Sequence, residues 1–219
     1  MIFLNFKTYE TGSGEKAVLM AKIAQEVSQL TGVKIISVVQ ATDIKEVVTS
    51  VATEVWAQKV DSITYGPHTG GILPEAVYED GASGVFLNHS ENSFVNFDEL
   101  KGAFDRATVV GLKTLIFAKD VDILEKITVL KPNYISYEPP SLIGSRDLSV
   151  VTASSQDVII AVDIARRSGV PLIVGAGVHS QEDVRKSLQL GAIGIAVASD
   201  IMLAQDPKSE LLDLARGFV

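Results

Sequence analysis

The chain alternates eight times between a short apolar run and a longer segment in which apolar residues recur at helical spacing. The short runs are apolar throughout and do not alternate with polar residues. This is typical of strands that are buried on both faces of a parallel sheet. The predicted strands are residues 2–5, 34–39, 54–58, 84–87, 113–118, 134–137, 172–174 and 194–197.

Eight helices are predicted to follow these strands. Ser180 and Asp183 resemble a capping box at one helix start, and glycines just past several helices suit a left-handed C-cap. The buried face expected for the first helix comprises Val18, Leu19, Ile23, Val27 and Leu30. The predicted helices are residues 15–30, 44–50, 73–80, 97–106, 121–130, 157–167, 181–190 and 209–216.

Eight strand–helix units of about 27 residues each account for the 219 residues of the chain. Parallel units in this number close most naturally into a (β/α)8 barrel, and an open doubly wound sheet is the competing topology. Neither a linker nor a low-complexity tract interrupts the pattern. We therefore expect one α/β barrel domain over residues 1–219.

In such a barrel the carboxyl ends of all the strands meet at one rim, where the loops carry the functional groups. Polar and small residues follow five of the predicted strands. We expect this rim to bring together Asn5 and Lys7, His89 and Glu91, Glu138, Gly175, Ala176 and Gly177, and Ala198 and Ser199.

Three of these side chains supply a cation, an electrophile and a base, which is what moving a proton beside a carbonyl requires. They are Lys7, His89 and Glu138. Glu138 precedes Pro139, which keeps the glutamate backbone extended at the strand end. Each also has an ordinary interpretation, as a solvated lysine, a structural histidine and a loop glutamate.

The small residues after the last two strands match the phosphate site that many barrels build there. In Gly175-Ala176-Gly177 and Ala198-Ser199, backbone N–H groups can approach phosphate oxygens closely, and a helix start adds its positive end. Glycines that serve tight turns only are the alternative. Residues 139–145, with Ile143 and Gly144 near the tip, have the composition of a lid or of a permanently packed loop.

Composition excludes several function classes. The net charge of -8, with no basic patch, argues against nucleic acid as a partner. Neither a thiolate nor a zinc site is expected, because the chain has no cysteine and its three histidines form no H-E-x-x-H pattern. The apolar runs are too short for a membrane span. We expect a soluble cytoplasmic protein, with His68 and His179 structural and Trp56 in the core or an interface.

Several segments, in this order along the chain, resemble those of the triosephosphate isomerase family and of its short archaeal branch. The match runs nearly from end to end, and no single segment would be specific alone. The segments are Asn5-Phe6-Lys7, Trp56-Ala57-Gln58 with His68-Thr69-Gly70, Leu87-Asn88-His89-Ser90-Glu91, Tyr137-Glu138-Pro139-Pro140 with Ile143-Gly144, Gly175-Ala176-Gly177, and Val197-Ala198-Ser199.

The resemblance implies a TIM barrel that interconverts dihydroxyacetone phosphate and glyceraldehyde 3-phosphate without metal or organic cofactor, in glycolysis and gluconeogenesis. It implies Glu138 as base, His89 as the group that polarises the carbonyl, Lys7 as the fixed positive charge and Asn5 as a hydrogen-bond donor. Glu91 would be a supporting carboxylate. The implied phosphate ligands are Asn5, Lys7, Ile143, Gly144, Gly175, Ala176, Gly177, Ala198 and Ser199.

The resemblance also implies a homo-oligomer, with a tetramer favoured and a dimer as the alternative, in which residues 64–71 form a docking loop. The chain departs from the family pattern at Arg146, in the lid, and at Gly71. Two other interpretations remain open at this point. One is a different phosphate-binding barrel enzyme, such as another sugar-phosphate isomerase, and the other is a non-catalytic ligand-binding or assembly module.

Overall fold

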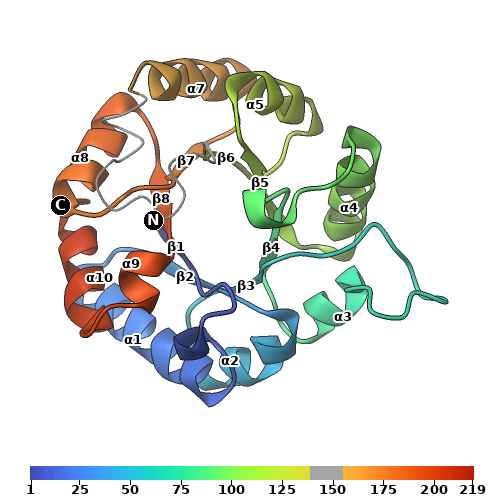
Figure 1. Ribbon diagram of the computed structural model, residues 1–219, viewed down its shortest axis with the longest axis horizontal. Helices are drawn as coiled ribbons and strands as arrows, with labels where there is room; N and C mark the ends of the chain where they lie inside the picture. Colours follow the sequence, from blue (N-terminus) through green and yellow to red (C-terminus); the bar gives the residue numbers. More distant parts are fainter. Residues whose placement is uncertain (139–154) are drawn as a thin grey trace.

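The protein forms a closed barrel of eight parallel strands in which β8 pairs with β1, as the computed structural model shows for residues 1–138 and 155–219. The predicted barrel is confirmed, and the open sheet is wrong. Helices surround the strands as an outer ring (Figure 1). The strands are β1 (Ile2–Asn5), β2 (Ile35–Val39), β3 (Val55–Ala57), β4 (Gly84–Leu87), β5 (Lys113–Ala118), β6 (Tyr134–Tyr137), β7 (Leu172–Gly175) and β8 (Gly194–Val197).

An aromatic cluster fills the inside of the barrel. Trp56 is fully buried, and the edge of its ring meets Phe3 with 5.0 Å between ring centroids. A Cβ on Gly84 would lie 2.4 Å from the indole, so this glycine makes room for the largest side chain of the chain. Trp56 therefore belongs to the core, one of its two predicted places.

The outer helices agree with the predicted segments to within a few residues. α4 runs four residues further than predicted, and α9 was not predicted at all. The α-helices are α1 (Glu15–Thr31), α2 (Ile44–Ser50), α3 (Pro74–Glu79), α4 (Phe97–Val110), α5 (Val121–Ile127), α7 (Ser155–Ser168), α8 (Gln181–Leu190), α9 (Ser199–Met202) and α10 (Pro207–Arg216). Single 3₁₀ turns are η1 (Glu10–Gly12), η2 (Ala41–Asp43), η3 (Ser90–Asn92) and η4 (Thr128–Leu130).

The buried face of α1 differs from the predicted one. Leu19 is 60% exposed and Leu30 is 64% exposed, although both were expected to be buried. Val18 and Val27 are buried as predicted. Three alanines and Met20 fill the rest of the inner face, because a helix that packs closely on a sheet leaves little space for branched side chains such as leucine. The buried residues of this helix are Ala17, Val18, Met20, Ala21, Ala24 and Val27.

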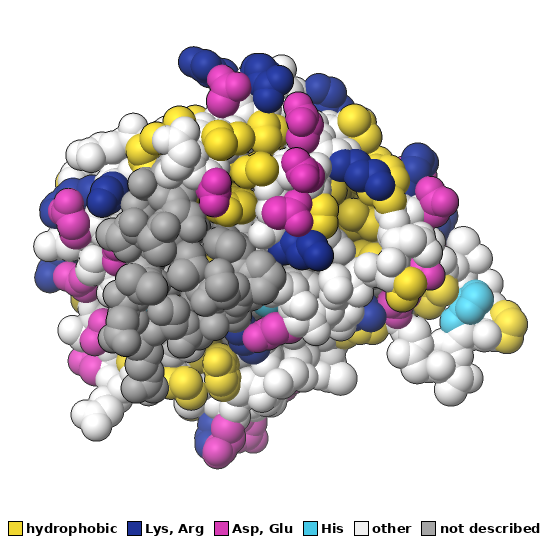
Figure 2. Space-filling view, turned by 45° about the horizontal axis from the view of Figure 1, so that its top comes forward, with side chains coloured by type: hydrophobic (Ala, Val, Ile, Leu, Met, Phe, Trp, Pro, Cys, Tyr) yellow, Lys and Arg dark blue, Asp and Glu magenta, His cyan; other side chains and the backbone are white. Residues whose placement is uncertain are grey.

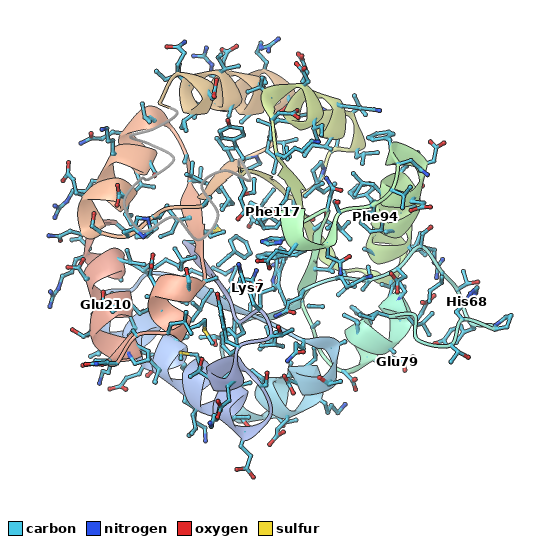
Figure 3. The ribbon with its side chains drawn as sticks, in the orientation of Figure 1. Lys7, His68, Glu79, Phe94, Phe117 and Glu210 are labelled. Atoms are coloured by element: carbon cyan, nitrogen blue, oxygen red, sulfur yellow. The ribbon has the colours of Figure 1, made fainter. Side chains whose placement is uncertain are left out.

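Local signals at helix ends were predicted correctly. Ser180 caps α8 by accepting a hydrogen bond from the backbone N–H of Asp183, and Gly111 and Gly191 adopt left-handed conformations just past their helices. None of the helices in the described ranges is long and apolar enough to cross a membrane. The segment that follows β3 projects beyond the ring of helices and carries His68 at its far end (Figure 1, Figure 3).

Candidate active site

The end of β1 holds a strained lysine. Lys7 has a left-handed backbone with φ of 47°, which residues other than glycine rarely adopt. Its N–H donates to Asn5 Oδ1 at 3.0 Å, and its C=O accepts from Gln58 Nε2 at 2.8 Å. These two bonds hold the conformation, which turns the lysine side chain toward the barrel mouth (Figure 3).

The end of β4 orients His89. Asn88 is also left-handed, with φ of 60°, and its amide donates to the carbonyl of Phe117 at 3.0 Å. His89 Nδ1 accepts from the backbone N–H of Glu91 at 3.2 Å, so in the neutral ring the proton lies on Nε2. The ring is buried and meets Phe117 edge-on at 4.9 Å between centroids.

Burial keeps this imidazole neutral. Desolvation lowers the pKa of His89 to about 4, against the opposing effect of Glu91 and with a small contribution from Lys7 in the same direction. At neutral pH the ring is therefore uncharged, and its Nε2–H is a hydrogen-bond donor rather than an acid.

Glu138 follows β6 and faces this donor. Its backbone N–H donates to the carbonyl of Ala118 at 2.9 Å, which continues the ladder by one residue. The residue is 7% exposed, and its carboxylate Oε2 lies 3.3 Å from His89 Nε2 and 3.3 Å from Ser90 Oγ. Burial raises the pKa of Glu138 to about 7, although Lys7 and the Ser90 hydroxyl lower it. A carboxylate with this pKa can accept a proton near neutral pH.

Glu91 supports Lys7 from the outer side. The ammonium nitrogen of Lys7 lies 2.7 Å from Glu91 Oε1. The other carboxylate oxygen of Glu91 lies 3.9 Å from His89 Nδ1, and the side chain is half exposed. Glu91 thus links the β1 and β4 ends, as expected from the sequence. It lies on the Nδ1 side of His89, whereas Glu138 lies on the Nε2 side.

The ends of β7 and β8 contribute backbone. Ala176 and Gly177 are consecutive left-handed residues with φ of 64° and 60°. Successive N–H groups in turns of this kind form concave anion-binding surfaces. Ala198 precedes α9, and Ser199 is its first residue.

One cavity at the barrel mouth joins these groups. Asn5, Lys7, His89 and Glu138 line one part of it. The two segments predicted to bind phosphate, Ala176-Gly177 and Ala198-Ser199, line the other. Phe86 and Phe117 contribute apolar surface. The sequence prediction that these loops share one rim is therefore confirmed for Asn5, Lys7, His89, Glu138, Ala176, Gly177, Ala198 and Ser199.

Gly175 has a different place from its neighbours. It is the last residue of β7 and does not line the cavity. A Cβ here would lie 3.2 Å from Glu138 Oε1 and 3.3 Å from Ser136 Oγ. The glycine thus leaves space for the glutamate. Ile143, Gly144, Arg146 and the rest of the predicted lid lie outside the described residues.

The sequence reasoning missed two polar cavity residues, His179 and Asp200. His179, expected to be a structural cap, lines the cavity, and its Nδ1 lies 2.6 Å from Asp200 Oδ2. The helix cap at this position is Ser180. No local pattern could reveal the pair, because its members belong to different βα loops. The nearest signal in the sequence was the pair of segments predicted to bind phosphate, since Gly177 lies two residues before His179 and Ser199 directly precedes Asp200.

Comparisons with known proteins agree with this geometry. The sequence model described as triosephosphate isomerase matches residues 1–216. The triosephosphate isomerase of Metallosphaera sedula is 41% identical, over 100% of this chain and 96% of the relative. That of Methanobacterium bryantii is 38% identical, over 98% and 95%. The crystal structure of triosephosphate isomerase from Bartonella henselae has a TM-score of 0.74 and 20% identity, covering 99% of this chain and 96% of that chain, and supports the fold.

Proposed function

The chain belongs to the triosephosphate isomerase family and is an aldose–ketose isomerase, and we propose that it interconverts dihydroxyacetone phosphate and glyceraldehyde 3-phosphate by proton transfer through an enediolate. The observation that carries this proposal is the buried Glu138 carboxylate 3.3 Å from a neutral imidazole, in one cavity with Lys7 and the phosphate segments.

In the proposed reaction Glu138 removes a proton from the carbon beside the carbonyl. The electron pair of that C–H bond forms the enediolate, and the protonated Glu138 then returns the proton to the neighbouring carbon. His89 donates from Nε2 to the carbonyl oxygen and moves protons between the two oxygens. A glutamate base with a neutral histidine is the arrangement already described for triosephosphate isomerase in general.

The remaining side chains stabilise the negative charge of the substrate and of the enediolate. Lys7 offsets the negative charge of the phosphate ester and of the enediolate, in a protein whose net charge is -8. Asn5 hydrogen-bonds near the reacting oxygens, and Glu91 holds Lys7 in place at 2.7 Å. This chemistry needs no metal or organic cofactor, since each proton has a side chain that carries it.

Backbone groups are proposed to bind the phosphate. The left-handed turn at Ala176 and Gly177 and the residues that open α9, Ala198 and Ser199, offer N–H groups from two sides. Ile143 and Gly144 are proposed to contribute from the lid, by resemblance to the family. Gly175 is proposed to contribute through the space that it leaves for Glu138.

The substrate can be tested with a panel of phosphate esters. The protein is incubated with glyceraldehyde 3-phosphate, dihydroxyacetone phosphate or a five-carbon aldose phosphate, and product formation is followed by NMR. We expect rapid interconversion of the two trioses and no reaction of the larger ester. Conversion of the larger ester alone would contradict the proposal and would point to another sugar-phosphate isomerase. Phosphate binding without any conversion would support a non-catalytic role instead.

The protein is further proposed to act as a single barrel domain in the cytoplasm, in glycolysis and gluconeogenesis, as a homo-oligomer with a tetramer favoured over a dimer. The protruding loop supports association, because Tyr65 on it is 68% exposed. Figure 2 shows hydrophobic side chains beside a histidine on this projection. Light scattering should give a mass near a multiple of 23.4 kDa. A particle of single-chain mass at working concentration would contradict this part of the proposal.

A further inference from the structure

A short hydrogen bond joins the two loops that carry the proposed phosphate site. His179 lies in the loop between β7 and α8, two residues after Gly177, and Asp200 directly follows Ser199. The ring Nδ1 of His179 and the carboxylate Oδ2 of Asp200 are 2.6 Å apart. The side chains are 23% and 34% exposed, so water competes only partly for this bond.

The first of these loops needs such support. Ala176 and Gly177 are both left-handed, and an alanine in this region persists only where the surroundings over-determine it. His179 fixes the following part of the loop twice. Its backbone N–H donates to Asp183 Oδ2 on α8 at 3.1 Å, and its ring binds Asp200.

Within the part of the chain that the structure describes, Asp200 is the hydrogen-bond partner that orients the ring. His179 Nε2 is buried and has no hydrogen-bond partner within the described residues. Nδ1 is therefore the polar atom through which the ring is held, with its N–H donating to the carboxylate. Both residues line the cavity that contains Lys7 and Glu138. The pair thus forms part of the wall between the two phosphate segments.

We propose that His179 and Asp200 are a positioning pair, which holds the β7–α8 loop and the start of α9 at the separation that a bound phosphate group requires. The inference rests on the proposed function, and it assigns the pair no contact with the reacting carbon. The pair then sets the affinity for phosphorylated substrates. A misplacement of about 1 Å in a binding segment has large effects on binding and turnover.

The test compares His179→Ala, Asp200→Ala and the double variant in the full chain. KM and kcat are measured with glyceraldehyde 3-phosphate, and the Kd of inorganic phosphate is measured by ³¹P NMR titration. We expect each single variant to raise KM and the phosphate Kd about tenfold, as for the loss of one charge-assisted hydrogen bond, with little change in kcat. The double variant should lose no more than either single variant, because both break the same bond.

Two further variants separate positioning from general structural damage. Asp200→Asn keeps an oxygen that accepts from His179 Nδ1–H and should restore most of the phosphate affinity. Asp105→Ala is the matched control, since it removes a surface carboxylate that binds Lys101 at 2.5 Å on α4, across the barrel from α9 (Figure 1). Should the alanine variants fail to fold, Asp200→Glu, which moves the carboxylate by one methylene, should still raise the phosphate Kd about threefold.

Several results would overturn the proposal. They are a phosphate Kd within twofold of the parent for a folded variant, additive losses in the double variant, no rescue by Asp200→Asn, or an equal loss of kcat/KM with unphosphorylated glyceraldehyde. The failure of the proposed function would look different. A parent protein that does not isomerise glyceraldehyde 3-phosphate contradicts that function, while the phosphate titrations still decide the role of the pair.

Discussion

The two sides of the cavity differ in the groups that they present, which are side chains on one side and backbone N–H groups on the other. On the β1, β4 and β6 side, side chains carry the chemistry, and a buried carboxylate with a pKa of about 7 faces an imidazole with a pKa of about 4. On the β7 and β8 side, the proposed binding groups are backbone N–H groups, at the left-handed residues Ala176 and Gly177 and at the start of α9. In the proposed function the first side determines turnover and the second determines affinity for phosphate.

This difference explains what each side tolerates. A side chain such as Glu138 cannot be replaced without loss of its proton-accepting group. A backbone site accepts any residue that keeps the loop conformation, so its sequence is less informative. Substitutions on the two sides should therefore change different kinetic constants.

The largest effect is expected from Glu138→Gln. An amide cannot accept the carbon proton, so kcat should fall about a thousandfold while the phosphate Kd stays near that of the parent. Turnover is measured by a coupled assay, with Glu99→Gln on the exposed surface of α4 as the matched control. If kcat fell less than tenfold, Glu138 would not be the base.

The pH profile should report the same carboxylate. Because the base must be ionised, kcat/KM should rise with pH and level off above about 7, the pKa of Glu138. At pH 5 the loss should be about a hundredfold, since the ionised fraction falls tenfold per pH unit. His89 should add no step between pH 5 and 8.

Unphosphorylated glyceraldehyde is the control substrate for this profile, because phosphate esters titrate near pH 6 themselves. A flat profile with that substrate between pH 5 and 8 would contradict the assigned base.

The phosphate side should respond to Gly177→Ala. The left-handed φ of 60° strains any residue with a Cβ, so KM should rise about fivefold to tenfold with a smaller change in kcat. Gly169→Ala is the matched control, because Gly169 has φ of 70° and open space around its Cβ position beyond α7. A loss of kcat at unchanged KM would mean that the two sides are not separable.

The smallest effect concerns stability. The pKa of Glu138 is raised in the folded state, from 4.5 to about 7, so its ionisation disfavours folding as the pH rises through this range. Glu138→Gln should therefore be about 1–3 kcal/mol more stable than the parent at pH 8 and equal to it at pH 4. Chemical denaturation at both pH values measures this. Glu99→Gln, on the exposed surface of α4, is the matched control, and an equal difference for both variants would count against burial as the cause.

Much of this molecule could be predicted from its sequence. Strands that are buried on both faces can be recognised in the sequence as apolar runs. Five of the eight predicted ranges agree with the observed strands at both ends. Lys7, His89 and Glu138 were predicted because their side chains carry distinctive chemistry next to strand ends.

Other features could not be predicted, for physical reasons. The inner face of α1 depends on how closely the helix packs, so alanines were buried and Leu19 and Leu30 were left exposed. The strained backbone of Lys7 is held in part by a bond from Gln58, which lies 51 residues away in sequence and meets Lys7 only in the folded sheet. The pair of His179 and Asp200 likewise arises from two loops, 21 residues apart in sequence, that meet in space.

Deuterium exchange tests the central claim most directly. Dihydroxyacetone phosphate is incubated in D₂O with the parent protein or with Glu138→Gln. The carbon that loses the proton and the carbon that gains it are both followed by NMR. The account predicts that the parent labels the carbon next to the carbonyl while glyceraldehyde 3-phosphate appears, and that Glu138→Gln shows neither change. Label exchange or isomerisation that persists in Glu138→Gln would contradict it.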